Sequence, residues 1–331
     1  MAAELEGRPR VLLADEIEKR AAERLARTAE LVRPAGEPLE TAIADVEAVI
    51  VRTTPLPRAT LEAAPRLRVI AKHGVGVDAI DVAYASERGI VVANVPAANA
   101  PAVAEFALLA ILSLLKPAAR GATWLRRDGG GKGSMVAAAG AGGLGGREVG
   151  GRTVAILGWG EIGRRVGTAL LGLGARVLAF DPAVEDGTVR AAGGEPAASL
   201  TELLAEAEIL SIHVPLNDAT RGLIGAEELA AMPPGALLVN TARGGVVDEA
   251  ALAAAIERGH LAGAAIDVFA TEPPPPDHPL LRLDEVVCTP HLAGTTEESL
   301  RRMAEGAVDA VLAVLAGERP AHVVAPQATR R

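Results

Sequence analysis

The sequence predicts an α/β protein with two lobes, each a doubly wound parallel sheet. Short apolar runs rich in Val, Ile and Leu alternate with helical patterns along the 331 residues. This alternation is typical of parallel sheets that are covered by helices. It occurs in two series, which are separated by a long apolar helix and a glycine-rich segment. Since the length also suits two domains of ordinary size, we expect each series to form its own lobe.

The first series predicts four strands with helices between them. Helical spacing of apolar residues is found at 16–28 and at 80–87. A longer apolar helix follows at about 100–115, with Asn99 as its cap and Pro101 in its first turn, where proline is tolerated. The strands are expected near 10–14, 48–51, 68–72 and 90–94.

A glycine-rich segment, residues 128–151, separates the two series. Such a run is hard to order because glycine loses the most backbone entropy on folding. We interpret it as a surface loop or insertion, with a lid over bound ligand as the alternative. The second series then predicts a final helix at about 297–316, which ends at Gly317. Its strands are expected near 153–157, 176–180, 209–214, 236–240, 263–269 and 286–288.

Composition and charge exclude several classes of protein. The net charge of −9 and the lack of a basic stripe in the sequence argue against a nucleic-acid partner. The single cysteine, Cys288, excludes an internal disulfide framework and a multi-cysteine metal site, so we expect no metal. Acidic residues interrupt the first apolar run, and the run 102–115 is too short to span a bilayer. We therefore expect a cytoplasmic protein with no membrane partner.

A dinucleotide site is predicted where the first strand of the second series meets its helix. The strand at 153–157 runs directly into Gly-Trp-Gly-Glu-Ile-Gly at 158–163. Gly158 permits the tight turn, Gly160 lets the backbone approach a pyrophosphate, and Gly163 lets the helix lie close to the strand. The helix N-terminus would then present unpaired N–H groups and partial positive charge to that anion.

The next strand ends at an acidic residue that favours NAD. Asp181 follows the strand at 176–180 and comes 18 residues after Gly163. A carboxylate in this place accepts hydrogen bonds from the adenosine ribose hydroxyls and repels the 2′-phosphate of NADP. A turn-forming or helix-capping role before Pro182 is the alternative. The pattern predicts NAD rather than NADP as the cofactor.

Three polar residues follow successive later strands. Arg243, Glu272 and His291 are expected beyond the carboxyl ends of parallel strands, which is where open sheets bind ligands. The planar fork of an arginine matches a carboxylate, and a histidine beside a carboxylate suits acid–base work. Taken singly, each residue has an ordinary reading as a turn, loop or strand-end side chain. Together they predict hydride transfer between nicotinamide and a small 2-hydroxy or 2-oxo acid.

At these residues the chain resembles the D-isomer-specific 2-hydroxyacid dehydrogenase family, which includes D-3-phosphoglycerate dehydrogenases. The resemblance spans about Val11 to Leu315. It implies a Rossmann-type NAD-binding domain, residues 103–292, inserted into a flavodoxin-like substrate-binding domain of residues 1–102 and 293–331. It also implies a homodimer formed through the cofactor lobe. Since the sequence ends soon after the last helix, we expect no C-terminal regulatory domain.

The resemblance also assigns roles to individual residues. Arg243 resembles the substrate-binding arginine, Glu272 the glutamate that pairs with the histidine, and His291 the acid–base. The residues expected to contact the cofactor are Gly158, Gly160, Glu161, Ile162, Gly163, Asp181, Thr241, Ala242, Asp267 and Gly294.

A loop in the first lobe resembles the substrate loop of the family. It reads Lys-His-Gly-Val-Gly-Val-Asp at 72–78, and the N–H groups of Val75 and Gly76 are expected to hold the substrate carboxylate. An ordinary strand-to-helix turn is the alternative. Arg52 and Lys72 fall at positions that are often basic in the phosphoglycerate enzymes, which suggests a further anionic group on the substrate. Ordinary surface cations would look the same.

The predicted reaction is the NAD-dependent interconversion of a small D-2-hydroxy acid and its 2-oxo acid. Candidate substrates are 3-phosphoglycerate and acids of the hydroxypyruvate or glyoxylate type. One alternative is an NAD-sensing binding protein or corepressor on the same fold. Another is a dehydrogenase of a different small anion, such as formate or phosphite, because an arginine and a backbone cradle suit any small anion.

Overall fold

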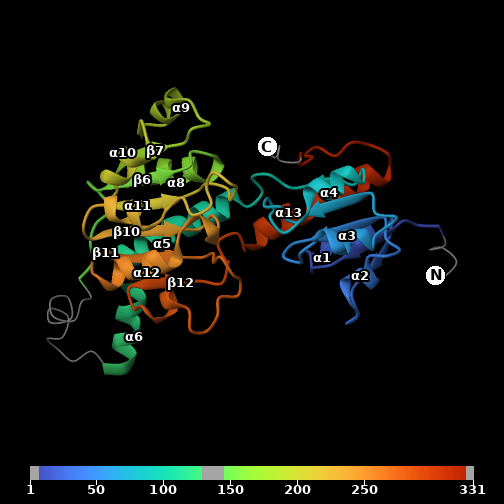
Figure 1. Ribbon diagram of the computed structural model, residues 1–331, viewed down its shortest axis with the longest axis horizontal. Helices are drawn as coiled ribbons and strands as arrows, with labels where there is room; N and C mark the ends of the chain where they lie inside the picture. The colour runs from blue at the N-terminus through green and yellow to red at the C-terminus, as the bar shows by residue number, and fades with distance from the viewer. Residues whose placement is uncertain (1–6, 129–144, 326–331) are drawn as a thin grey trace. The chain divides into compact units, whose positions relative to one another are not determined.

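The computed structural model describes residues 7–128 and 145–325, and it divides into two compact units (Figure 1). The terminal lobe consists of Met1–Asn99 and Thr295–Arg331, and the central lobe of Ala100–Gly294. The first boundary therefore falls after residue 99 rather than the predicted 102, and the second after 294 rather than 292. Most of the predicted glycine-rich loop, residues 129–144, lies outside the described residues.

The terminal lobe is a five-stranded sheet in the order β2-β1-β3-β4-β5, and all its strand pairs are parallel. The chain passes from β1 to one neighbour and then returns to β3 on the other side, which is the flavodoxin-like order. The strands are β1 (Arg10–Leu13), β2 (Glu30–Val32), β3 (Ala48–Val51), β4 (Val69–Lys72) and β5 (Val91–Ala93). The helices are α1 (Lys19–Ala26), α2 (Leu39–Ala42), α3 (Arg58–Glu62), α4 (Val82–Glu87) and α13 (Glu297–Leu315).

Both faces of this sheet are buried, because successive side chains of each strand point to opposite cores. Helices α1 and α13 cover one face and pack against Val11, Leu13 and Ile50. Helices α2, α3 and α4 cover the other face and pack against Leu12 and Val49. Burial on two sides explains why the strands read as unbroken apolar runs in the sequence.

The central lobe is a seven-stranded parallel sheet in the order β12-β11-β10-β9-β6-β7-β8. Its strand order reverses between β6 and β9, which is where open sheets of this kind bind ligands. The strands are β6 (Thr153–Leu157), β7 (Arg176–Phe180), β8 (Glu195–Pro196), β9 (Ile209–Ile212), β10 (Ala236–Asn240), β11 (Leu261–Ile266) and β12 (Val286–Cys288). Both lobes therefore have the predicted doubly wound parallel architecture.

Helices cover both faces of the central sheet as well. α5 and α8 lie on one face, and α10, α11 and α12 lie on the other (Figure 1). Among its described residues, α6 has no buried side chain. The helices are α5 (Ala100–Leu115), α6 (Ala118–Asp128), α8 (Glu161–Gly172), α9 (Asp186–Ala191), α10 (Leu200–Ala205), α11 (Ala226–Ala231) and α12 (Glu249–Glu257), with short 3₁₀ turns η1 (Gly244–Val246) and η2 (Pro279–Arg282).

The structure differs from the sequence-based expectations in two unpredicted strands and in the bounds of several elements. Strands β2 and β8 were not predicted, because each is a short edge strand of three and two residues. The strand predicted at 263–269 starts at Leu261 and ends at Ile266, since the next residue, Asp267, binds a neighbouring turn. The helix predicted from residue 16 begins at Lys19, where the Glu18 carboxylate accepts the N–H of Ala21 as an N-cap.

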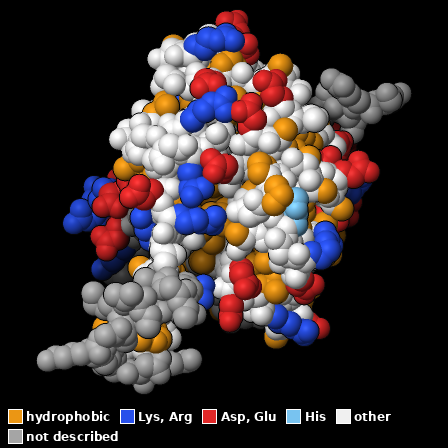
Figure 2. Space-filling view, turned by 90° about the vertical axis from the view of Figure 1, so that its left-hand side faces the viewer, with side chains coloured by type: hydrophobic (Ala, Val, Ile, Leu, Met, Phe, Trp, Pro, Cys, Tyr) orange, Lys and Arg blue, Asp and Glu red, His pale blue; other side chains and the backbone are white. Residues whose placement is uncertain are grey.

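The face of the molecule drawn in Figure 2 mixes charges of both signs. Figure 2 shows Lys and Arg side chains interspersed with Asp and Glu over the face that it draws. Within residues 7–128 and 145–325, no single helix has the length and apolar composition to cross a membrane; α5 and α6 meet the criterion only as a pair, which is bent by 59°.

The terminal lobe buries one histidine directly after β4. The side chain of His73 is 1% exposed, and its Nε2 lies 3.2 Å from the carbonyl oxygen of Leu300 in α13. Its Nδ1 has no hydrogen-bond partner among the described residues. Burial, with a smaller contribution from the charge of Arg52, lowers the pKa of His73 from 6.5 to about 4.

We expect the His73→Gln variant to lose less stability in mild acid than the wild type. Below pH 6.5 the unfolded chain binds this proton, whereas the folded chain does not until about pH 4. The wild type therefore loses unfolding free energy as the pH falls through this range, by at most ~1.4 kcal/mol per pH unit from this residue. Urea unfolding at pH 7, 6 and 5, followed through the fluorescence of Tyr84, the chain's one tyrosine, measures the difference.

The exposed His322 of the same lobe provides the matched control. His322→Gln should follow the wild-type pH dependence. An equal pH dependence in His73→Gln would show that the buried ring does not cause the acid destabilisation.

Candidate active site

The turn after β6 has close contacts at two glycines and open space at the third. A Cβ on Gly158 would lie 2.7 Å from the carbonyl oxygen of His213, and one on Gly163 would lie 2.0 Å from the carbonyl oxygen of Gly158. Gly158 also has a φ of +96°, which favours glycine. A Cβ on Gly160 would meet no described atom within 4 Å. The turn therefore has the shape that the three predicted glycine roles require.

This turn fits the pyrophosphate of a dinucleotide. Gly160 is exposed and precedes the first residue of α8, so the N-terminal N–H groups of that helix border the open space. The turn also lies at the point where the strand order reverses. The Glu161 side chain pairs with Arg164 and Arg165 of its own helix, which offsets its negative charge. The backbone of Glu161 and Ile162 thus belongs to the helix end that would meet the anion.

Asp181 has the turn-forming role that was the alternative to the predicted ribose contact. Its Oδ2 accepts the N–H of Trp159 at 2.8 Å, and its Oδ1 accepts the N–H of Ala183 at 2.9 Å. The carboxylate therefore shapes the turn before Ala183 and ties it to the glycine turn. Because each carboxylate oxygen has a second lone pair, it can still accept a ribose hydroxyl. The half-buried Asp181 side chain is thus suited to the predicted ribose contact.

The buried ring of Trp159 and the half-buried ring of His213, which were not predicted as site residues, support the glycine turn. Trp159 is 2% exposed and lies against α8, where a Cβ on Gly167 would come within 2.5 Å of its ring. His213 follows β9; its Nε2 lies 2.9 Å from Ser211 Oγ, and burial lowers its pKa to about 3. Neither position stands out in the sequence, because both depend on contacts between neighbouring strands and α8.

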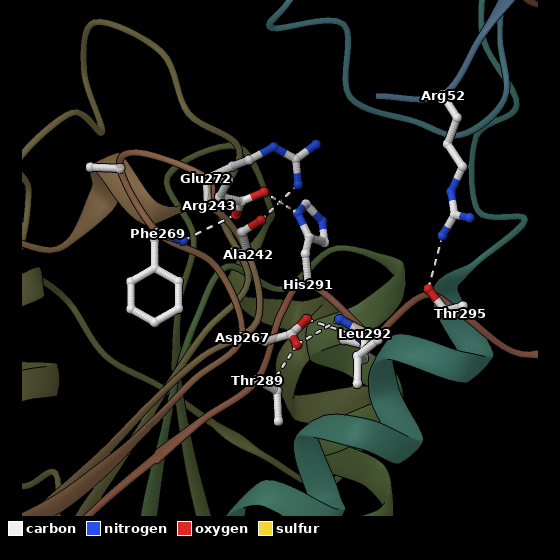
Figure 3. A network of polar contacts seen from close by, with 12 residues as sticks. Arg52, Ala242, Arg243, Asp267, Phe269, Glu272, Thr289, His291, Leu292 and Thr295 are labelled. Carbon is white, nitrogen blue, oxygen red and sulfur yellow. Dashed lines mark hydrogen bonds and ion pairs between the residues drawn. The ribbon is translucent and has the colours of Figure 1, made fainter. Parts of the chain in front are cut away.

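The predicted glutamate and histidine form a hydrogen-bonded pair. Oε2 of Glu272 lies 2.8 Å from Nδ1 of His291, and its Oε1 accepts the N–H of Phe269 at 3.0 Å (Figure 3). The side chains are 37% and 51% exposed, so the pair is open to ligand. Contact at Nδ1 leaves Nε2 as the ring nitrogen that can exchange a proton with a substrate.

The surroundings keep the Glu272 carboxylate ionised. Partial burial raises its pKa, but the hydrogen bonds from His291 and from the Phe269 N–H, with the charges of His291 and Arg243, outweigh burial and lower it below the ordinary value. A carboxylate that stays negative at neutral pH stabilises a protonated imidazole beside it. The pair is therefore arranged for a histidine that gains and loses a proton.

Arg243 lies beside this pair. It follows β10 in an extended conformation before η1, and Asn240 fixes the turn by donating its side-chain N–H to the Arg243 carbonyl at 2.9 Å. Its Nη1 donates to the carbonyl of Ala242 at 2.6 Å, and Figure 3 shows the guanidinium next to Glu272 and His291. The three residues thus lie together, while their roles in binding and proton transfer stay predictions.

A buried carboxylate fixes the turn that carries His291. Asp267 is 1% exposed and accepts the Thr289 hydroxyl at 2.6 Å and the N–H groups of Leu292 and Ala293 at 2.7 and 2.9 Å. Its carbonyl oxygen accepts the N–H of His291 at 2.8 Å. His291 itself has a φ of +55°, a strained value for a non-glycine residue. The sequence analysis assigned Asp267 only to the cofactor, and that contact stays a prediction.

The remaining cofactor residues surround the same strand ends. Thr241 is 7% exposed, and its hydroxyl has no hydrogen-bond partner among the described residues. Since buried hydroxyls normally have a partner, Thr241 is a candidate to bind the nicotinamide half. The N–H of Ala242 is already bound to Asn240 Oδ1 at 3.0 Å. Gly294 is the last residue of the central lobe, three residues after His291.

The predicted substrate residues belong to the terminal lobe. Arg52 and Lys72 lie at the carboxyl ends of the adjacent strands β3 and β4, and the Lys72 ammonium donates to the carbonyl of Arg52. The Arg52 guanidinium donates to Thr295 Oγ1 at 2.9 Å (Figure 3). The carbonyl of Val75 accepts an N–H from the Asn94 side chain, in the turn that also contains Gly76. Their contact with substrate stays a prediction.

We expect Gly160→Ala to weaken NADH binding without unfolding the lobe. The new methyl group has room in the free protein, so the loss of stability should stay within about 1 kcal/mol, the usual range for an N-cap. It would occupy the space of the pyrophosphate and weaken binding by about tenfold or more. Energy transfer from the buried Trp159 to NADH measures the affinity.

Gly172, at the other end of α8, is the matched control because its Cβ would also meet no described atom within 4 Å. Gly172→Ala should bind NADH like the wild type. Full affinity in Gly160→Ala would mean that the dinucleotide does not lie on this turn.

Comparison with known proteins identifies the family. Residues 108–293 match the model of the D-isomer-specific 2-hydroxyacid dehydrogenase NAD-binding domain. The chain is 40% identical over 292 residues to a D-3-phosphoglycerate dehydrogenase of Mycobacterium tuberculosis, covering 86% of this chain and 52% of that protein. It is 36% identical over 324 residues to a glyoxylate reductase of Korarchaeum cryptofilum, covering 96% of both chains.

The chain spans about half the length of the D-3-phosphoglycerate dehydrogenases that it matches. The crystal structure of an NADPH-dependent glyoxylate/hydroxypyruvate reductase from Sinorhizobium meliloti, in complex with NADP and malonate, superposes with a TM-score of 0.83 at 30% identity and covers 96% of this chain and 97% of that one. These matches confirm the predicted fold and the predicted NAD-binding domain. The chain belongs to the D-isomer-specific 2-hydroxyacid dehydrogenase family.

Proposed function

We propose that the protein is an NAD-dependent dehydrogenase that interconverts a small D-2-hydroxy acid and its 2-oxo acid. The observation that carries this proposal is the hydrogen-bonded pair of Glu272 and His291 beside Arg243, in the lobe that also carries the glycine turn. A nicotinamide cofactor, when bound, supplies or accepts the hydride. The protein must then supply a proton donor, a proton acceptor and a means of orienting the acid.

His291 is the proposed acid–base. Its Nδ1 is bound to Glu272, so its Nε2 gives a proton to the carbonyl oxygen of the 2-oxo acid during reduction and takes the hydroxyl proton during oxidation. The Glu272 carboxylate stabilises the protonated ring. Arg243 binds the substrate carboxylate through its planar fork and polarises the neighbouring carbonyl. Each step uses a residue of the central lobe.

The substrate class follows from the anionic groups that the residues can bind. Arg243 suits one carboxylate, and relatives with the names phosphoglycerate dehydrogenase, glyoxylate reductase and hydroxypyruvate reductase suggest which acids to test. Arg52 and Lys72 support a second anionic group such as a phosphate. We therefore propose phosphohydroxypyruvate, hydroxypyruvate and glyoxylate as candidate substrates, with the Val75–Gly76 backbone as a further carboxylate ligand.

NAD is the proposed cofactor in preference to NADP. The Asp181 carboxylate lies where the adenosine ribose of a dinucleotide on this turn would be recognised, and a negative charge there repels a 2′-phosphate. The relative from Sinorhizobium meliloti is described as NADPH-dependent, so members of the family differ in this preference. Comparing NADH with NADPH in the same assay tests the role of Asp181.

We expect wild-type protein to oxidise NADH with at least one of the candidate 2-oxo acids, and His291→Ala to reduce turnover by about 10²–10⁴.

Glu272→Gln should lower the pH above which reduction fails, because the protonated ring loses its negative partner. Both effects are measured from NADH absorbance between pH 5 and pH 9, with glyoxylate, pyruvate, hydroxypyruvate or phosphohydroxypyruvate as the substrate. Formate and phosphite are tested separately with NAD, by following the formation of NADH.

Asp277→Asn is the control, because this exposed carboxylate lies on the same loop as Glu272. It should leave rate and pH profile unchanged. Binding of NADH without turnover of any acid would favour an NAD-sensing protein, and turnover of formate or phosphite alone would favour a dehydrogenase of another small anion. Full activity in His291→Ala would remove this residue from the mechanism.

We also propose that two copies of the chain associate through the central lobe. A cavity of about 240 Å³ lies between α5 and the strand ends of β10, β11 and β12. Thr241, Asp267 and Thr289 of the candidate site line its inner part, and Phe106, Leu109 and Val287 also line it. Leu109 is 59% exposed and Val287 is 39% exposed. On α6, which follows α5, Leu125 is 58% exposed. Exposed apolar side chains are common at protein–protein contacts, and a second copy would cover Leu109 and Val287.

We expect wild-type protein to sediment at twice the chain mass, and Leu109→Asp to sediment as a monomer, because a buried unpaired charge would oppose association. Leu173, which is 49% exposed at the end of α8, is the control position. Leu173→Asp should leave the mass of the wild type unchanged. A monomeric wild type, or a dimeric Leu109→Asp, would contradict this interface.

The cytoplasm is the proposed compartment. The single cysteine allows no internal disulfide. Burial, with a contribution from the negative charge of Glu249, raises the pKa of Cys288 to about 11, so this side chain stays a thiol. Both features suit a reducing environment.

A further inference from the structure

The central lobe contains a second glutamate–histidine pair, which is better buried than the first. Oε2 of Glu249, the first residue of α12, lies 2.9 Å from Nε2 of His278, which caps η2. The side chains are only 14% and 12% exposed, against 37% and 51% for Glu272 and His291. Because it is closed to ligand, this pair is unsuited to proton exchange with a substrate.

The ring of His278 is fixed on several sides. The N–H of Leu280 donates to its Nδ1 at 3.3 Å, so Nδ1 carries a lone pair and Nε2 carries the hydrogen that faces Glu249. Phe269 packs edge-on against the ring, with centroids 5.3 Å apart and planes at 82°. A ring that donates from Nε2 and accepts at Nδ1 satisfies all these contacts, and it fixes the orientation of the Glu249 carboxylate.

The other oxygen of Glu249 holds the loop that leads to the catalytic pair. Oε1 accepts the N–H of Ala270 at 2.6 Å, while the preceding N–H, that of Phe269, donates to Oε1 of Glu272 at 3.0 Å. Two carboxylates therefore bind two consecutive N–H groups. Gly244 closes the other side, because a Cβ there would lie 1.9 Å from the Phe269 carbonyl carbon. The Phe269–Ala270 peptide is thus fixed from both sides.

Residues 267–278 belong to no helix or strand, so the position of Glu272 depends on these side-chain contacts. We propose that Glu249 and His278 are positioning residues for the reaction. They hold the Phe269–Ala270 peptide so that the Phe269 N–H keeps the Glu272 carboxylate aligned on Nδ1 of His291. This inference rests on the proposed function, since it assigns a role to the surroundings of the same pair.

Kinetics of single and double variants test this chain of contacts. Glu249→Ala should lower kcat by about tenfold to a hundredfold, as substitution of a residue that orients a reactive group often does. KM should change little, because the substitution leaves Arg243 in place. Glu249→Gln should recover only part of the rate, since its amide oxygen can still accept the Ala270 N–H while its NH2 group then faces the Nε2–H of His278. Glu257→Ala, at the exposed end of the same helix, is the control and should match the wild type.

The decisive variant is Glu249→Ala combined with Glu272→Gln. If Glu249 acts through Glu272, the double variant is as slow as Glu272→Gln alone, because the supported interaction is already lost. Rate losses that multiply would overturn the proposal, as would a Glu249→Ala loss confined to KM. If Glu249→Ala does not fold, His278→Phe takes its place, because it keeps the ring contact with Phe269. It should lower kcat by itself, and it should cause no further loss when combined with Glu272→Gln.

A spectroscopic measurement separates this proposal from the proposed function. The Nδ1–H of His291 bound to a carboxylate should give a low-field proton resonance at low temperature, which Glu272→Gln removes. Glu249→Ala should weaken or broaden it, and Glu257→Ala should not. Wild-type protein that turns over no 2-oxo acid would refute the function, while this resonance would still decide the positioning role. An unchanged resonance in Glu249→Ala would overturn the inference.

Discussion

The geometry of the candidate site depends on one buried carboxylate. Asp267 follows β11 and accepts three hydrogen bonds from residues 289–293, which follow β12, while its carbonyl oxygen accepts the N–H of His291. A charge in the interior is stable only when it is fully hydrogen-bonded, and these donors satisfy it. The same bonds hold His291 at a positive φ that an isolated turn would not keep. The position of His291, the proposed acid–base, is therefore set by the interior of the lobe and not by its surface.

Asp267 and Glu272 are close in sequence but have different environments, which suit them to different roles. Asp267 is 1% exposed, and its oxygens are occupied by the protein. Glu272 is partly exposed and binds one N–H group and one imidazole nitrogen, so its charge is available to a neighbouring ring. Burial thus separates Asp267, which fixes the backbone of the site, from Glu272, which we propose assists proton transfer. The less exposed Glu249 belongs with the first kind, because its oxygens bind a peptide N–H and the ring of His278.

Local patterns made much of this structure predictable. The glycine turn depends on residues within one strand–helix unit, and Arg243 and His291 follow strands whose apolar runs are plain in the sequence. The short edge strands β2 and β8 offered no such run. The pairing of Glu249 with His278 joins residues 29 apart through an irregular loop, and the link from Asp267 to the Leu292 and Ala293 N–H groups depends on β11 and β12 being neighbours. Contacts of this kind arise from tertiary packing, so they cannot be predicted from the periodicity of apolar residues along the sequence.

The contact of Gly244 with the Phe269–Ala270 peptide has a consequence for changing the specificity of this enzyme. The backbone next to Arg243 touches the backbone that supports the pair of Glu272 and His291, with no space even for a methyl group between them. An engineered shift of the Arg243 turn, made to admit a bulkier acid, would be transmitted to Glu272 and would slow proton transfer. Redesign for new substrates should therefore keep this backbone intact and alter side chains elsewhere around the ligand.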